Sequence, residues 1–138
     1  MMVRREVIER RLKKLDEYLS VLSELQKYSL DDFLAEPERY GSTERFLQLA
    51  IETTIDIGNH IVADMNLGDV QWSSDIASIL HEKGYLTVEL REVWIKMIGF
   101  RNLLVHDYLD IDRTKVHQIL QNNLSDLKAL EKVFAQFL

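Results

Sequence analysis

The sequence has no cysteine, a single proline and only five glycines in 138 residues. Without thiols the chain forms neither disulfides nor thiolate metal sites. This composition fits the reducing interior of a cell, so we expect a cytoplasmic protein. Few prolines and glycines leave few points at which a helix must break. We find no sustained alternation of apolar and polar residues and no hairpin turn between apolar runs, which argues against a protein built of β-strands.

Long apolar runs are also absent. No stretch approaches the roughly 20 apolar residues that span a bilayer, so we expect no membrane-spanning segment. Arg4 and Arg5 open the chain, but Glu6 and Glu9 soon interrupt the positive charge, as in an amphipathic helix and unlike a signal peptide. The motifs of phosphate-binding loops, dinucleotide-binding turns, nucleophile elbows and zinc sites are missing, which argues against the enzyme classes that depend on them.

The chain is acidic, with a net charge of −6 and a pI near 5.2. Proteins that bind nucleic acid through their overall field are usually basic, so any RNA contact must be local or must depend on a partner. Acidic residues are interspersed among the cations at the start of the first predicted helix, which favours a solvated helix face over a binding patch. These cations are Arg4, Arg5, Arg10, Arg11, Lys13 and Lys14.

The sequence is rich in apolar residues at helical spacing. Its length predicts one domain, residues 1–138, with one hydrophobic core. The spacing and the capping residues predict four long helices: residues 3–28, from Ser42 or Thr43 to Met65, from the cap Thr87 to Tyr108, and from the cap Asp112 to residue 137. Pro37 fits the first turn of a separate short piece.

Two short helices are predicted, over residues 31–35 and 75–83, the second capped by Ser73 or Ser74 and ended by Gly84. The fold class is therefore an all-α, up-and-down bundle of four long helices with one or two short ones. The helix that ends at Met65 is apolar on two faces, which is typical of a central helix or of one shared with a second subunit.

Three side chains able to handle a phosphodiester lie between Arg101 and Tyr108. Arg101 offers a planar fork of donors that suits a phosphate. His106 supplies an imidazole, the side chain best suited to give or take a proton at neutral pH. The Tyr108 hydroxyl can donate to phosphate or be modified, and Asn102 adds an amide. Taken singly, each has a structural explanation: an interface salt bridge, a cation at a helix end, a core aromatic. Their coincidence favours a site.

The spacing of these residues predicts a geometric conflict on one straight helix. At about 100° per residue, Arg101 and Tyr108 share a face, whereas His106 lies roughly 140° away from Arg101 and shares a face with Asn102. Either the helix loosens around His106, or two copies of the chain pair so that residues from both subunits line one cleft. The second arrangement makes Arg101 and His106 parts of a composite site around a two-fold axis.

The run from Arg101 to Tyr108, Arg-Asn-Leu-Leu-Val-His-Asp-Tyr, resembles the signature of the HEPN superfamily, specifically its HepT-like branch. The resemblance implies an all-helical, homodimeric ribonuclease toxin that cleaves RNA without a metal or other cofactor. The ribose 2′-hydroxyl attacks the adjacent phosphate and leaves a cyclic phosphate. His106 is then the general acid or base, and Arg101 stabilises charge in the transition state.

The same resemblance implies a protein partner. HepT-like toxins are paired with a minimal nucleotidyltransferase antitoxin, which attaches AMP to the motif tyrosine; here that is Tyr108. The added phosphate would block RNA from the cleft. The rival interpretation is a non-catalytic, dimeric helical module that binds the nucleotidyltransferase or a nucleotide and cleaves nothing.

Polar residues interrupt the apolar helix that ends at Met65. Glu52, Asp56 and Asn59 share one face, and buried carboxylates need partners, so we predict that Glu52 or Asp56 orients Arg101. The alternative is that this stripe is the solvent edge of the helix. Asp56, His60 and Asp64 also share a face, but three ligands on one straight helix span about 12 Å, which disfavours a metal site.

The other histidines and the tryptophans are given no catalytic role. We predict that His81 and His117 are surface residues. Trp72 and Trp94 are predicted to be packing groups rather than stacking platforms for bases.

Overall fold

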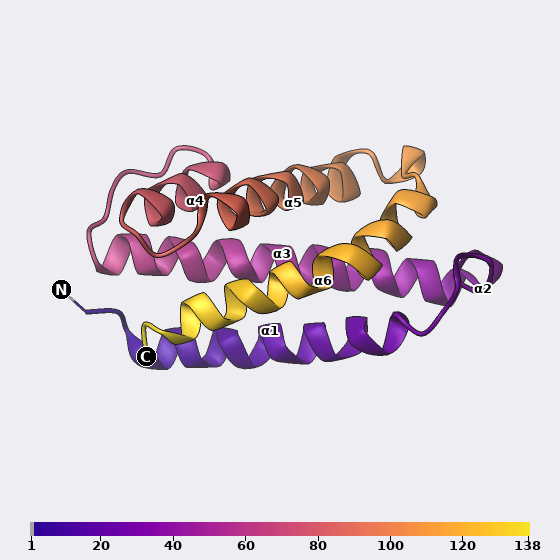
Figure 1. The fold of residues 1–138 in the computed structure, drawn as a ribbon, viewed down its shortest axis with the longest axis horizontal. Helices are drawn as coiled ribbons and strands as arrows, with labels where there is room; N and C mark the ends of the chain where they lie inside the picture. Colours follow the sequence, from indigo (N-terminus) through magenta and orange to yellow (C-terminus); the bar gives the residue numbers. More distant parts are fainter. Residues whose placement is uncertain (1) are drawn as a thin grey trace.

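The computed structural model describes residues 2–138, and in this range the chain forms helices and no strands. The four long helices are α1 (Arg5–Leu25), α3 (Pro37–Asp64), α5 (Val88–His106) and α6 (Arg113–Ala135). Two short helices, α2 (Leu30–Ala35) and α4 (Ser73–Glu82), and a 3₁₀ turn, η1 (Tyr108–Asp110), complete the order. Figure 1 shows α5, α3 and α1 running along the long axis one below another, with α6 passing obliquely across α3 from the end of α5 to the start of α1. The predicted all-α bundle is confirmed.

Side-chain caps fix several helix starts where the sequence predicts them. The Thr87 hydroxyl accepts a hydrogen bond from the Leu90 N–H, and the Asp112 carboxylate accepts from Thr114 and Lys115. Ser29 caps α2 in the same way. Such caps satisfy backbone donors that have no partner within the helix. Gly84, at φ +85°, follows the end of α4, where a side chain would be strained.

The predicted start of the second long helix is wrong. Ser42 and Thr43 do not cap it, because α3 begins five residues earlier with Pro37 in its first turn. A proline is tolerated there because the missing N–H would have no helical partner. Thr43 is buried inside the helix, and its hydroxyl donates to the Arg39 carbonyl oxygen at 2.8 Å. Pro37 therefore belongs to α3 and not to a separate short piece.

Other boundaries shift less. Helix α1 ends at Leu25 rather than near Tyr28, and the N-cap of α4 is Trp72 rather than Ser73 or Ser74. The Asp75 carboxylate accepts from the backbone N–H groups of Gln71 and Trp72 at 3.0 and 2.9 Å. These two bonds to the Asp75 side chain set the start of α4 without a serine cap.

Helix α3 is the centre of the bundle, and α1, α4, α5 and α6 all pack against it. This explains its two apolar faces. Trp94 of α5 is fully buried as predicted, and its indole N–H donates to the Thr54 hydroxyl of α3 at 3.0 Å. Trp72, by contrast, is 72% exposed, so the prediction that it is a packing group is wrong. None of the helices in residues 2–138 combines the length and apolar character needed to cross a membrane.

Candidate functional site

Arg101 lies near the end of α5 and is tied to the central helix by Glu52. Its Nε and Nη2 groups donate to the Glu52 Oε1 atom at 3.0 and 2.9 Å. The two side chains keep 28% and 33% of their surface exposed, so the pair lies at the edge of the bundle and not in its core. The predicted contact between Glu52 and Arg101 is therefore present.

Asn102 and Gln48 complete this polar group. The Arg101 Nη1 group donates to the Asn102 Oδ1 atom at 3.1 Å, which leaves the Asn102 NH₂ group as a donor. Gln48 lies one turn before Glu52, and its Nε2 group donates to Glu52 Oε1 at 3.0 Å. We did not predict a role for Gln48, although its i,i+4 spacing to Glu52 is a signal that the sequence contains.

Asp56 does not contact Arg101, so that alternative for the positioning residue is wrong. Its carboxylate is paired with Arg11 of α1, and its other oxygen lies 3.5 Å from the His60 Nε2 atom. Asp56 lies one turn beyond Glu52, where the neighbour is α1 and not the end of α5. It therefore joins α1 to α3.

Arg4 contacts two polar side chains near the C-terminal end of α3, those of Asp64 and His60. The Asp64 carboxylate accepts from the Arg4 backbone N–H at 3.0 Å and from the Arg4 guanidinium, and these interactions lower the pKa of Asp64. His60 Nδ1 lies 3.0 Å from Arg4 Nη2. Within residues 2–138 no acidic and histidine side chains are grouped to hold a metal ion. Instead, Asp56 pairs with Arg11 and Asp64 with Arg4, and His60 lies between them, so these side chains join α3 to Arg4 and to α1.

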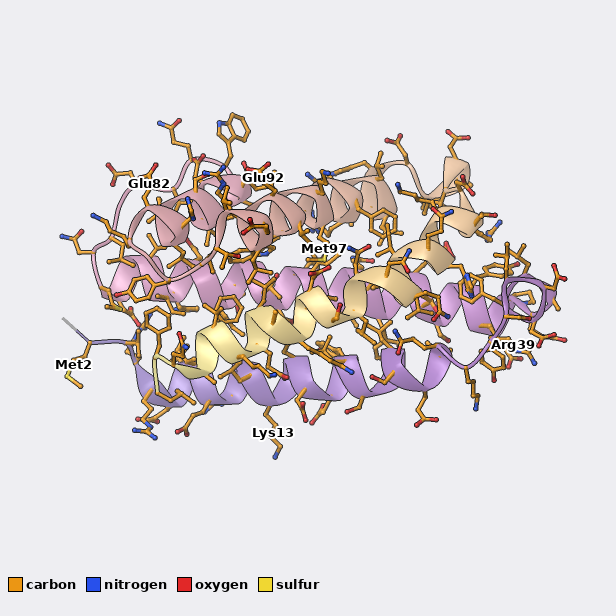
Figure 2. The ribbon with its side chains drawn as sticks, in the orientation of Figure 1. Met2, Lys13, Arg39, Glu82, Glu92 and Met97 are labelled. Carbon is orange, nitrogen blue, oxygen red and sulfur yellow. The ribbon has the colours of Figure 1, made fainter. Side chains whose placement is uncertain are left out.

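The cations at the start of the chain are largely paired with acids. Arg5 contacts Glu9, and Lys14 contacts Glu17. Lys13 points away from the bundle (Figure 2). This arrangement supports the solvated-face interpretation over a basic binding patch.

His106 is the last residue of α5, and Tyr108 lies beyond it. The Asp107 N–H still bonds to the Leu103 carbonyl oxygen at 2.9 Å, but Asp107 leaves helical geometry and η1 follows. Tyr108 therefore does not share a helical face with Arg101, because the chain turns between them. Its side chain is 63% exposed, and the adjacent Leu109 is 84% exposed. In residues 2–138 no hydrogen bond or ion pair engages the exposed His106 ring.

A groove of about 810 Å³ lies between α5, η1 and the first half of α6. Figure 2 labels Met97 between α5 and α6, on the side of α5 that lines this groove. Apolar side chains make most of its lining, namely Val93, Met97, Phe100, Leu103, Ile111 and Ile119, and Lys96, Lys115, Asp107 and Asp110 lie among them. On α5 the lining runs from Val93 to Leu103, so it ends one residue after Asn102.

His81 and His117 are half-buried rather than surface residues, contrary to prediction. The His81 Nδ1 atom lies 2.9 Å from the Leu86 carbonyl oxygen, and His117 Nε2 lies 3.0 Å from that of Tyr28. Each ring is hydrogen-bonded to the backbone of a loop, and neither takes part in the contacts of Arg101 described above.

A family model described as "Ribonuclease HepT-like" matches residues 8–133. The chain belongs to this family. The resemblance noted in the motif is therefore confirmed by a match that extends over nearly all of the helical bundle.

Two curated relatives of this HepT-like chain are nucleases. A tRNA nuclease HepT of Aphanizomenon flos-aquae is 37% identical over 110 residues, which cover 80% of this chain and 75% of the relative. An mRNA nuclease HepT of Shewanella oneidensis is 37% identical over 82 residues, which cover 59% of this chain and 62% of the relative.

A solved structure is similar over almost the whole HepT-like chain. It is the tri-AMPylated HEPN toxin of Shewanella oneidensis in complex with its MNT antitoxin, with a TM-score of 0.86 and 26% sequence identity. The alignment covers 94% of this chain and 97% of the toxin. The bundle described above is thus the fold of a toxin known in a toxin–antitoxin complex.

Proposed function

We propose that the protein is a metal-independent RNA endonuclease and the toxin of a toxin–antitoxin pair. The observation that carries the proposal is the Arg101 guanidinium, held by Glu52 at the edge of the bundle, five residues before an exposed and unengaged histidine. Two relatives are a tRNA nuclease and an mRNA nuclease, which supports cleavage of RNA by this chain.

The proposed reaction is attack by a ribose 2′-oxygen on the neighbouring phosphorus. The bond from the 2′-oxygen to phosphorus forms, and the bond from phosphorus to the 5′-oxygen breaks, so the products are a cyclic phosphate and a 5′-hydroxyl. His106 takes the proton of the 2′-hydroxyl or protonates the leaving 5′-oxygen. Arg101 stabilises the extra negative charge on the phosphate oxygens, with Asn102 beside it. Each role contributes about 100- to 1,000-fold in rate.

We further propose that two copies of the chain form the active cleft. A two-fold interface requires a self-complementary patch. The groove beside the motif is apolar and carries both lysines and aspartates, so a second copy can place apolar residues on apolar residues and Lys96 or Lys115 near Asp107 or Asp110. Pairing there brings His106 of one subunit toward Arg101 of the other, which a single helix does not do.

We also propose that an antitoxin that transfers AMP regulates the protein. Tyr108 is the motif tyrosine, and its 63% exposure leaves the hydroxyl open to a nucleotidyltransferase. The similar Shewanella toxin is AMPylated and bound to its MNT antitoxin. AMP on Tyr108 adds a negative phosphate two residues from His106 and thereby repels RNA from the cleft.

Incubation with RNA in EDTA tests the proposed activity. Protein whose intact mass excludes AMP on Tyr108 is compared with Arg101→Ala and His106→Ala. We expect cleavage with cyclic phosphate ends by the wild type and a loss of about 100-fold or more in each variant. No cleavage by the unmodified wild type contradicts the proposal and supports the rival, a dimeric module that binds a nucleotidyltransferase or nucleotide. The net charge of −6 is the observation that favours this rival.

A further inference from the structure

We infer that Gln48 is a positioning residue of the cleavage site, acting on Arg101 through Glu52. The inference rests on the proposed ribonuclease function. The observation behind it is that three donors share one acceptor atom. Glu52 Oε1 accepts from Gln48 Nε2 at 3.0 Å and from Arg101 Nε and Nη2 at 3.0 and 2.9 Å. Gln48 and Arg101 thus hold the same carboxylate oxygen from two helices.

The Glu52 side chain needs a second anchor because it is partly exposed. A glutamate at the edge of a helix has several rotamers of similar energy, and an exposed ion pair alone holds it weakly. The Gln48 amide lies one turn away on the same helix and donates to the oxygen that Arg101 uses. It therefore selects the rotamer in which Glu52 reaches Arg101 across the boundary between α3 and α5.

The consequence for Arg101 is a fixed guanidinium plane. Two of its nitrogens are directed at Glu52, so Nη1 points toward Asn102 and the remaining donors keep one direction. Donors that stabilise a transition state are most effective when they need not reorganise during the reaction. Loss of the Gln48 anchor leaves the charge of Arg101 in place but not its orientation. RNA binding should therefore change little while the chemical step slows.

In residues 2–138 the side chain of Gln48 is hydrogen-bonded to the site only through Glu52. Its side-chain amide makes no other hydrogen bond within residues 2–138, and its backbone lies in the middle of α3. Gln48→Met keeps the length and the helix propensity of the side chain but removes the donor. Gln26→Met is a matched control, because the Gln26 Nε2 group donates at 2.9 Å to the Leu120 carbonyl oxygen, away from Arg101.

The test is RNA cleavage kinetics of Gln48→Met and Gln26→Met. We expect Gln48→Met to lower kcat about five- to tenfold, as for one hydrogen bond in a charged network, with KM within about twofold of the wild type. Gln26→Met should leave kcat unchanged. In a Glu52→Ala background, Gln48→Met should have no further effect, because the connection is already cut.

A second readout follows Arg101 directly. The ¹H–¹⁵N signal of its Nε–H group, assigned by its loss in Arg101→Lys, should shift and exchange faster with water in Gln48→Met but not in Gln26→Met. Wild-type kcat together with an unchanged Arg101 signal in Gln48→Met overturns the inference. If the wild type cleaves no RNA, the proposed function fails, and the Arg101 signal then decides alone whether Gln48 positions the guanidinium.

Discussion

At the scale of single residues, the surface of α3 divides its carboxylates between two tasks. Glu52 faces the end of α5 and holds Arg101, whereas Asp56 and Asp64 face the start of the chain and pair with Arg11 and Arg4. The sequence predicted that Glu52 or Asp56 would orient Arg101 but did not decide between them. One helical turn separates the two, and the choice depends on where α1 and α5 cross α3, which no local pattern specifies.

Asp64 should make the free energy of unfolding depend on pH in the acidic range. Hydrogen bonds from Arg4 lower the pKa of Asp64 in the folded state, while in the unfolded chain an aspartate has a pKa of about 3.9. The stability that the Asp64 carboxylate contributes is therefore complete above the pKa of the unfolded state. It is lost as the pH falls through the lower pKa of the folded state. We expect the urea midpoint of the wild type to fall more steeply below pH about 4 than that of Asp64→Asn.

The comparison with Asp64→Asn is needed because other carboxyls act in the opposite direction. Burial raises the pKa of Glu44, and burial together with Asp16 raises that of Glu131. Protonation of Glu44 and Glu131 therefore stabilises the folded state as the pH falls. Both residues are present in the wild type and in Asp64→Asn, so the comparison cancels their effect. Parallel midpoint curves for the wild type and Asp64→Asn would show that the contact with Arg4 does not persist in solution.

At the scale of helices, the approach of α4 and α5 to α3 depends on a missing side chain. Gly58 is buried in α3, and a Cβ atom there would lie 2.5 Å from Ile76 Cγ2 and 3.0 Å from Trp94 Cη2. Neither neighbour is a free end of a flexible side chain, because both are themselves buried. The glycine is therefore required by packing and not by its backbone conformation.

Gly58→Ala should destabilise the protein by about 1–3 kcal/mol, the usual effect of overpacking a core. Gly41→Ala in the same helix is the control. A Cβ atom at Gly41 would meet no neighbouring atom within 4 Å, so this substitution should stabilise the helix by about 0.5–1 kcal/mol. Urea denaturation at neutral pH measures both. Equal free energies of unfolding for the two variants would contradict the close packing of α3 with α4 and α5.

The helices themselves were largely predictable, because apolar spacing and caps such as Thr87 and Asp112 act locally. The start of α3 was not. Gly41, Ser42 and Thr43 look like a break followed by a cap, yet the helix runs through them because it packs on both sides along its length. The predicted end of α5, Tyr108, is two residues too late. A helix that ended there would place Tyr108 on the face of Arg101, whereas in the structure Tyr108 lies in an exposed turn.

At the scale of the whole molecule, the bundle is packed around α3 and open beside α5. The groove between α5 and α6 and the exposed Leu103 and Leu109 at its end leave apolar surface next to the motif. Apolar patches of this kind commonly mark sites of association. This surface supports the proposal made above that the catalytic unit is two chains, with Arg101 of one subunit and His106 of the other acting on the same phosphate.

A mixture of two inactive variants tests this assignment most directly. Arg101→Ala and His106→Ala are unfolded together in equal amounts and refolded, and cleavage of RNA in EDTA is compared with each variant refolded alone. About half of the dimers should be mixed, and each mixed dimer holds one cleft with both residues, so we expect about a quarter of the wild-type rate. If the refolded wild type cleaves RNA but the mixture is no more active than either variant alone, Arg101 and His106 do not act across two subunits.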